Sequence, residues 1–288
     1  MKLSDIQIRD PFVVPRPHEG KYYMYGSTDK DIWQLGNGFD VYVSEDLEEW
    51  EGPFQVFRNY DGFFADRNFW APEVYEYNSF FYMFATFRRR ANDLLGTAVL
   101  RSESLYGPFQ LYSDGVVTPA EWSCLDGSLY VDDEGVPWMV FCREWQSIGD
   151  GEVWVVQLSQ DLQRASHEPQ LLFSASDAPW PTSFLHPRYP NQMNYVTDGT
   201  YMMKNDRGQL ILLWASFIDN KYAQGTAIST SGKVTGPWLH QQQPLYTEDG
   251  GHGMIFRTFQ GEHLLALHSP NKTPHERAIF IPVNMSKI

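Results

Sequence analysis

A short sequence pattern recurs along this chain, clearly in four places and in a fifth, more divergent copy near the C-terminus. In each copy an acidic or polar residue opens an apolar strand, a turn containing Gly follows, and two further strands come next. The opening residues are 63, 53, 72 and 54 positions apart, running from Asp10 through Glu73, Asp126 and Asp198 to His252. A repeat of this length that contains several strands is typical of a β-propeller.

The repeats predict the whole architecture. Their Gly-containing turns suit tight hairpins, and no segment shows the periodicity of an amphipathic helix. We therefore expect an all-β chain that forms one domain over residues 1–288. That domain is a five-bladed β-propeller with four antiparallel strands in each blade around a central axis. Insertions at about residues 59–68 and 174–194 fall between blades, where loops build the rim of a pocket.

Charge and composition limit the partners. With a net charge of −14, the chain lacks the surplus of Lys and Arg that nucleic acids or anionic membranes require. No stretch is long and apolar enough to span a membrane. The N-terminal segment lacks the apolar core of a signal peptide, which favours a cytoplasmic location. Cys124 and Cys142 are expected to be buried free thiols. The sequence leaves the oligomeric state open.

The opening residues are also the candidate functional groups. Acidic residues form strands poorly, and several of them aimed at one cavity repel each other. Each could instead cap a turn by accepting backbone hydrogen bonds. Because Asp opens three of the five copies, each time before Pro or Gly and an apolar run, we favour a functional role.

Clustered carboxyl groups suit the hydrolysis of a glycosidic bond. One carboxylic acid protonates the leaving oxygen, and a second, as carboxylate, activates water or attacks the anomeric carbon. A third carboxylate nearby raises the pKa of the acid by like-charge repulsion. The aromatic content of 16% fits this chemistry, since flat rings stack on sugars, although it also fits an ordinary β-rich core.

Motifs in all five copies resemble glycoside hydrolase family 43, whose members are five-bladed propellers acting on arabinose- and xylose-containing glycans. The similar motifs are Arg9-Asp10-Pro11-Phe12, Phe69-Trp70-Ala71-Pro72-Glu73, Leu125-Asp126-Gly127, Thr197-Asp198-Gly199 and Gly251-His252-Gly253. The resemblance implies an inverting reaction with Asp10 as the general base. It also implies that Asp126 tunes the pKa of the acid, and that the residue at position 198 is the general acid.

Position 198 departs from the family pattern, which usually has Glu there. Asp198 is one methylene shorter, so its carboxyl group would lie about 1.5 Å further from the glycosidic oxygen. Three outcomes remain open. Asp198 can stay the acid if the blade shifts inward, or Glu144 can reach in from blade three, unless Glu144 pairs with Arg143 or another Arg. In the third outcome catalysis is impaired and the protein only binds sugar.

The resemblance also implies a His near a central calcium or sodium ion, and His252 stands at that position. A hydrogen-bonded core histidine is the alternative, and no cofactor is expected to be required for the reaction. The expected substrate contacts are aromatic residues near the rim of blades one and two, together with an arginine in the long insertion. They are Trp33, Phe39, Phe69, Trp70 and Arg188. Core packing or a structural ion pair is the alternative for each of them.

We therefore expect an inverting, exo-acting α-L-arabinofuranosidase whose partner is a small, neutral oligosaccharide. The alternatives are a β-xylosidase or galactofuranosidase of the same family, or a carbohydrate-binding propeller without turnover. A separation of roughly 6.5–9.5 Å between the acid and base carboxyl groups would support inversion.

Overall fold

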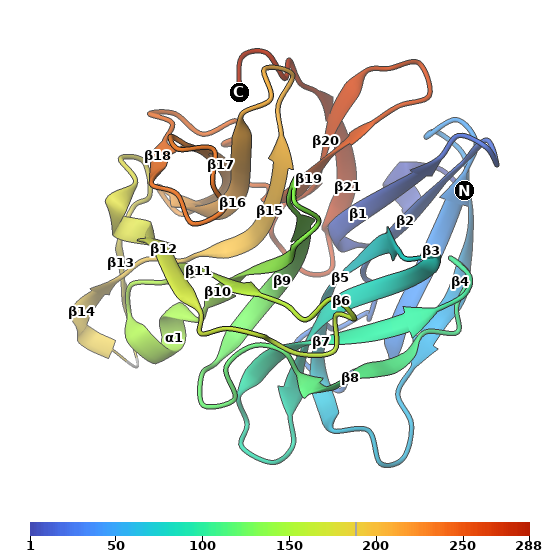
Figure 1. Ribbon diagram of the computed structural model, residues 1–288, viewed down its shortest axis with the longest axis horizontal. Coiled ribbons are helices and arrows are strands. Elements are labelled where there is room, and N and C mark those ends of the chain that lie inside the picture. The colour runs from blue at the N-terminus through green and yellow to red at the C-terminus, as the bar shows by residue number, and fades with distance from the viewer. Residues whose placement is uncertain (188) are drawn as a thin grey trace.

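The structure is a computed structural model that describes residues 1–187 and 189–288, and it consists of antiparallel sheets arranged around an axis (Figure 1). Blade 1 contains β1 (Arg9–Arg16), β2 (Lys21–Ser27), β3 (Gly38–Ser44) and β4 (Trp50–Arg58). Blade 2 contains β5 (Ala65–Tyr77), β6 (Phe80–Arg89), β7 (Leu95–Ser102) and β8 (Gln110–Val116). Blade 3 contains β9 (Cys124–Val131), β10 (Pro137–Arg143), β11 (Glu152–Gln157) and β12 (Gln170–Ser174).

The second half of the chain adds two more blades and a hairpin. Blade 4 contains β15 (Asp198–Lys204), β16 (Leu210–Ile218), β17 (Lys221–Ser229) and β18 (Trp238–His240). Blade 5 contains β19 (Gly251–Arg257), β20 (His263–Ser269) and β21 (Arg277–Pro282). Between blades 3 and 4 lies a hairpin of β13 (Phe184–His186) and β14 (Tyr189–Asn194). The described helices are short, namely η1 (Leu3–Asp5), α1 (Trp145–Ile148) and η2 (Ala175–Asp177).

The first strands of the blades close a ring. In cyclic order β1 contacts β5, β5 contacts β9, β9 contacts β15, β15 contacts β19, and β19 returns to β1. Buried apolar side chains fill the space between neighbouring blades in five separate clusters, one for each pair of adjacent blades. The ring confirms the predicted all-β, five-bladed propeller. Successive residues of β2 alternate between two clusters, since Tyr22 and Met24 pack between blades 1 and 5 whereas Tyr23 and Tyr25 pack between blades 1 and 2.

Blade 5 differs in one detail from the prediction of four strands in every blade. It has three strands, and the N-terminal segment lies at its outer edge, where Gln7 forms an isolated antiparallel bridge with Arg277. The Arg277 Nε atom donates a hydrogen bond to the Ser4 carbonyl at 2.9 Å. Ile6 and Ile8 are buried in the cluster between blades 1 and 5. The start of the chain thus joins its last blade to its first.

Each first strand contains a residue with a left-handed backbone at a point where its pairing with the second strand shifts register, and β5 has a second such residue, Asn68, nearer its start. A β-bulge of this kind bends the strand and re-aims a side chain. The five residues have φ angles between 47° and 57°, and they are Asp10, Ala71, Asp126, Gly199 and His252. The bulge is therefore a feature of every blade, and it defines which positions are equivalent around the ring.

This equivalence corrects two assignments made from the repeat. Glu73 follows the bulge residue Ala71 by two positions, and Asp198 precedes the bulge residue Gly199 by one. Neither of them occupies the place that Asp10, Asp126 and His252 occupy. The spacing between repeats could not reveal these offsets, because a shift of one residue in a strand changes the face to which its side chain points.

Glu73 lies in the interior of the propeller instead of in the pocket. It is buried, and its carboxyl group accepts a short hydrogen bond from the Tyr75 hydroxyl group. That hydroxyl group also lies 2.9 Å from Ser128 Oγ. Burial raises the pKa of Glu73 to about 8, and the negative charge of Asp10 adds to the shift. The folded protein therefore keeps Glu73 uncharged at neutral pH.

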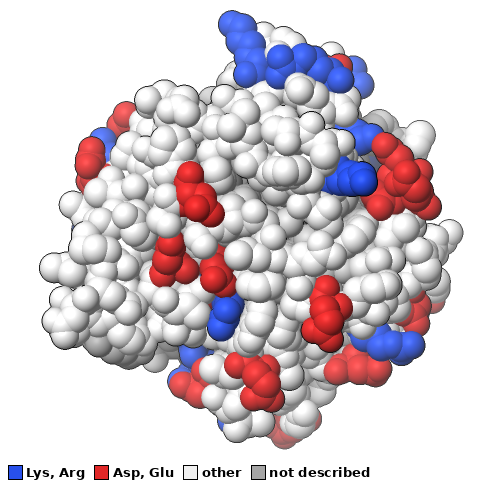
Figure 2. Space-filling view, turned by 60° about the vertical axis from the view of Figure 1, so that its left-hand side comes forward, with Lys and Arg blue, Asp and Glu red and all other residues white. Residues whose placement is uncertain are grey.

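The remaining features agree with the composition. Cys124 and Cys142 are free and buried, as expected. None of the helices among the described residues is long and apolar enough to cross a membrane. Figure 2 shows a face on which uncharged residues predominate, with scattered acidic side chains and basic ones gathered mainly along its upper edge.

The buried Glu73 predicts a pH dependence of stability. As pH rises from about 4.5 to about 8, the unfolded chain loses a proton from Glu73 that the folded chain retains. Wild-type stability should therefore fall over this window, by about 1.4 kcal/mol for each unit of pKa difference. Glu73→Gln should show a smaller fall than the wild type when urea unfolding is compared at pH 5 and pH 8, because the contributions of Glu144 and Asp126 remain. Glu76→Gln, on the same strand but exposed, serves as the control, and equal pH slopes in the wild type and Glu73→Gln would contradict the assignment.

Candidate active site

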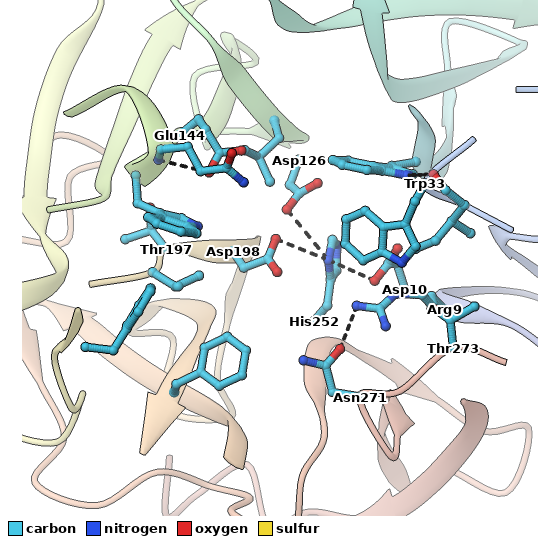
Figure 3. Close-up of a pocket in the computed structure, with 18 of the residues that line it drawn as sticks. Arg9, Asp10, Trp33, Asp126, Glu144, Thr197, Asp198, His252, Asn271 and Thr273 are labelled. Carbon is cyan, nitrogen blue, oxygen red and sulfur yellow. Dashed lines mark hydrogen bonds and ion pairs between the residues drawn. The ribbon is translucent and has the colours of Figure 1, made fainter. Parts of the chain in front are cut away.

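A cavity of about 1020 Å³ opens at one end of the propeller axis, and residues from all five blades line it. The bulges of blades 1, 3 and 5 contribute Asp10, Asp126 and His252, while Asp198 comes from the start of blade 4. Glu144 directly follows β10, the second strand of blade 3, and caps α1. Figure 3 shows Glu144 on one side of Asp126 and Asp198, and Asp10 on the other side, beyond His252. The structure thus brings together all four carboxyl groups that the sequence nominated.

His252 is the centre of this group. Its Nδ1 atom lies 3.2 Å from Asp10 Oδ1, 3.6 Å from Asp126 Oδ2 and 3.8 Å from Asp198 Oδ1. Because Asp10 Oδ1 and Asp198 Oδ1 face the same nitrogen at 3.2 Å and 3.8 Å, they lie at most 7.0 Å apart. Three carboxyl groups from distant parts of the sequence therefore surround one imidazole ring, as circular closure predicts.

Asp10 is held in the form that a general base needs. Its backbone N–H donates to His268 Nδ1 at 3.1 Å, and its Oδ2 atom accepts a hydrogen bond from Ser27 Oγ at 2.7 Å. Burial alone would raise the pKa of Asp10, but His252, Arg9 and the other polar neighbours outweigh it and lower the pKa below the ordinary value. The carboxylate is thus ionised at neutral pH, and its other oxygen, Oδ1, lies 3.2 Å from His252 Nδ1.

His268 contacts the Asp10 backbone, and no sequence pattern indicated this role. It is fully buried and accepts the Asp10 N–H at Nδ1, so its other nitrogen, Nε2, is the donor toward Asn271 Oδ1 at 3.3 Å. The same Asn271 oxygen accepts a hydrogen bond from Arg9 Nη2 at 2.6 Å. Burial and the nearby Arg9 charge lower the pKa of His268 to about 3. A neutral histidine therefore connects the left-handed backbone of Asp10 to Asn271.

Asp126 and Asp198 form a close pair. The Gly199 N–H donates to Asp126 Oδ2 at 3.0 Å, and the Thr86 hydroxyl accepts the Asp126 N–H at 2.8 Å. Burial and the charge of Asp198 raise the pKa of Asp126 well above its ordinary value. Asp198 Oδ2 accepts a hydrogen bond from the Tyr222 hydroxyl at 2.6 Å. The negative charge of Asp198 therefore favours a protonated carboxyl group on Asp126.

Glu144 is a buried carboxyl group with the pKa of an acid catalyst. Its Oε1 atom accepts a hydrogen bond from the Gln146 N–H at 3.3 Å, which caps the N-terminus of α1. Arg143 pairs with Glu152 at 3.3 Å, so the structure does not support a Glu144–Arg143 salt bridge. Burial raises the pKa of Glu144 to about 7, and the negative charge of Asp198 contributes to the shift.

The structure separates the expected substrate contacts into two classes. Trp33 and Trp70 line the cavity and meet edge to face, with ring centroids 5.3 Å apart. Phe39 and Phe69 do not line the cavity. They are 0% and 1% exposed in the core between blades 1 and 2, so their prediction as substrate contacts is wrong. Phe69 precedes Trp70 in β5, and neighbouring residues in a strand face opposite sides. Arg188 lies outside the described residues.

His252 also belongs to a candidate cation site. Asp126, Asp198 and His252 each offer one ligand atom, and these atoms lie within 4.8 Å of one another. Two oxygen atoms and one nitrogen atom fit a calcium or sodium ion only if water or sugar hydroxyl groups supply the remaining ligands, because calcium takes six to eight. Such an ion would offset the charge of the acidic pair. The metal-binding role of His252 stays a prediction.

Comparison with known proteins places these features in a family. The sequence model described as "Glycosyl hydrolases family 43" matches residues 5–286. The endo-arabinase of Bacteroides thetaiotaomicron VPI-5482 is 38% identical, and its structure matches with a TM-score of 0.90 over 99% of this chain and 96% of that one. A thermostable family-43 glycoside hydrolase is 22% identical, with a TM-score of 0.80 over 96% and 90%. The Cellvibrio cellulosa α-L-arabinanase complexed with arabinohexaose is 16% identical, with a TM-score of 0.70 over 97% and 92%. The last two show likeness of fold alone.

A substitution at Gly199 tests how closely the bulges of blades 4 and 5 must approach each other. It has a φ of +56°, and an added Cβ atom would lie 2.6 Å from His252 Cα and 2.9 Å from His252 Cβ. Gly208 has a φ of +73° but open space around it, so Gly208→Ala should lose only the left-handed strain of about 1–2 kcal/mol. Gly199→Ala should lose more stability and also activity, because His252 must move. Equal unfolding free energies and unchanged kcat in both variants would show that His252 has no fixed position.

Proposed function

Because this chain belongs to glycosyl hydrolase family 43, we propose that it is an inverting α-L-arabinofuranosidase that releases terminal arabinose from short oligosaccharides. The observation that carries the proposal is the pair of carboxyl groups with opposite pKa shifts in one cavity, Asp10 lowered and Glu144 raised. Arabinose as the sugar is supported by the 38% identity to an endo-arabinase. The cavity volume of about 1020 Å³ has room for more than one sugar unit.

Asp10 is the proposed general base. In an inverting reaction the base takes a proton from water while the water oxygen bonds to the anomeric carbon, and the glycosidic C–O bond breaks on the opposite face. A lowered pKa keeps Asp10 ionised and ready to accept that proton. Hydrogen bonds from Ser27 and to His268 fix its orientation, so the water can be positioned against one oxygen.

Glu144 is the proposed general acid, in preference to Asp198. A pKa of about 7 keeps much of Glu144 protonated at neutral pH, as proton donation to the leaving oxygen requires. The hydrogen bond from the Tyr222 hydroxyl group occupies Asp198 Oδ2, and Asp198 Oδ1 lies no more than 7.0 Å from Asp10 Oδ1. That limit allows only the short end of the range of about 6.5–9.5 Å for inverting pairs.

Asp198 then takes the role of tuning the acid. Its negative charge raises the pKa of Glu144, while Asp126 holds the Gly199 N–H and so fixes the start of β15. The shorter side chain at position 198 is compatible with this role, because a charge acts over distance whereas proton donation needs direct contact.

The pH dependence and leaving-group dependence test the acid. Wild-type kcat/KM should fall as pH rises through about 7, where Glu144 loses its proton. In Glu144→Gln the fall of kcat/KM above pH 7 should disappear, and kcat/KM for arabino-oligosaccharides should be lower by a factor of about 10²–10⁴. Activity on a dinitrophenyl arabinofuranoside should be retained, because its leaving group needs no proton. Asp198→Asn should lose activity without selective rescue. Rescue of Asp198→Asn and not of Glu144→Gln would identify Asp198 as the donor.

The reaction products show whether the saccharide is cut at its end or internally. Terminal cleavage predicts release of arabinose alone from linear arabino-oligosaccharides, with little loss of viscosity in debranched arabinan. Internal cleavage is the second candidate, favoured by the similarity to an endo-arabinase, and it would give larger oligosaccharides with a rapid loss of viscosity. Nitrophenyl xylosides and galactofuranosides serve as controls for the sugar. Binding of arabino-oligosaccharides without turnover of any substrate would indicate a carbohydrate-binding propeller.

A further inference from the structure

The cavity has two aromatic walls, and only one of them was expected from the sequence. Trp33 and Trp70 form the wall near Asp10, where the Trp33 ring lies 5.9 Å from the Arg9 guanidinium. Trp145 and Phe184 form the other wall, with ring centroids 5.0 Å apart and planes at 75°. Both walls line the same cavity.

The chain places the second wall beside the proposed acid. Trp145 directly follows Glu144 and is the first residue of α1. Arg9 directly precedes Asp10, the proposed base. In an inverting hydrolysis the acid lies next to the leaving group, and the base lies on the opposite face of the sugar that is attacked. The wall next to Glu144 is therefore on the leaving-group side of the scissile bond.

Hydrogen bonds within the protein hold the second wall in place. The Tyr189 hydroxyl group of the β13–β14 hairpin donates a short hydrogen bond to the Gln146 carbonyl of α1. The Tyr195 N–H, just after the hairpin, donates to the Gly149 carbonyl at 3.1 Å. Helix and hairpin are thus fastened together. Leu185 of the hairpin also lines the cavity and is 63% exposed, which extends the apolar surface outward.

We propose that α1 and the β13–β14 hairpin form the leaving-group subsite, in which Trp145 stacks on the sugar unit that departs. The occupant is a neutral pentose unit of the oligosaccharide, because flat aromatic faces recognise the apolar face of a sugar ring. This inference rests on the proposed function, since it takes Glu144 as the acid. Trp145 is then a determinant of substrate length, and the wall of Trp33 and Trp70 binds the glycone, the sugar unit that is attacked.

The test compares two substrates that both need the acid but differ in the leaving group, arabinotriose and methyl α-L-arabinofuranoside. Trp145→Ala should lower kcat/KM for arabinotriose about 10- to 100-fold and leave the methyl glycoside within about twofold of wild type. Trp145→Phe should have a kcat/KM for arabinotriose between those of the wild type and Trp145→Ala, which excludes misfolding as the cause. Trp33→Ala, the matched control on the glycone wall, should lower kcat/KM for both substrates.

The outcomes separate the subsite from the reaction. Equal losses on both substrates in Trp145→Ala, with the wild type active, would overturn the subsite alone, because Trp145 would then act through Glu144 or the fold. An unchanged arabinotriose rate would overturn it as well. A wild-type protein inactive on both substrates would overturn the proposed function, and the subsite with it.

Discussion

The site depends on one backbone feature, the left-handed bulge that interrupts the first strand of every blade. A straight strand would alternate its side chains between the two interblade clusters and present none of them along the axis. The bulge turns one residue of each blade out of that alternation, and ring closure aims the turned residues at a common centre. Where the residue is Asp or His, a functional group results. Blade 2 has Ala71 there and blade 4 has Gly199, whose lack of a Cβ atom leaves room for His252.

Bringing three carboxyl groups around one imidazole ring would be unfavourable if all were equally charged. The surroundings make them different. Burial acts to raise the pKa of both Asp10 and Asp126. At Asp10 the charges of His252 and Arg9 outweigh burial and the pKa is lowered, whereas at Asp126 the charge of Asp198 adds to burial and the pKa is raised. Glu144 lies further out, buried at the cap of a short helix, and its pKa is raised to about 7. A division of one ionised base and one protonated acid is what hydrolysis of a glycosidic bond requires.

Much of this was predictable from the sequence, because repeats report on topology. The five copies of the pattern predicted the five blades and the closed ring, and those opened by Asp10, Asp126 and His252 predicted the convergence of these side chains. Register was not predictable. The repeat made Glu73 and Asp198 equivalent to Asp10. In the structure Glu73 lies two residues after the bulge residue of blade 2, and Asp198 lies one residue before the bulge residue of blade 4. Phe39 and Phe69 were expected at the rim, but strand alternation sends them into the core. His268 and Trp145 gave no signal, since their roles depend on neighbours from other parts of the chain.

A direct titration tests whether the ring assembles carboxyl groups whose pKa values differ, with Asp10 lowered and Glu144 raised. Carboxyl ¹³C NMR of the wild type, with Glu144→Gln used to assign the resonance, should show Glu144 titrating near pH 7. The Asp198→Asn substitution should move that titration to lower pH, because it removes the neighbouring negative charge. A Glu144 resonance that titrates at the ordinary value of about 4.3, with the same midpoint in Asp198→Asn, would contradict the account.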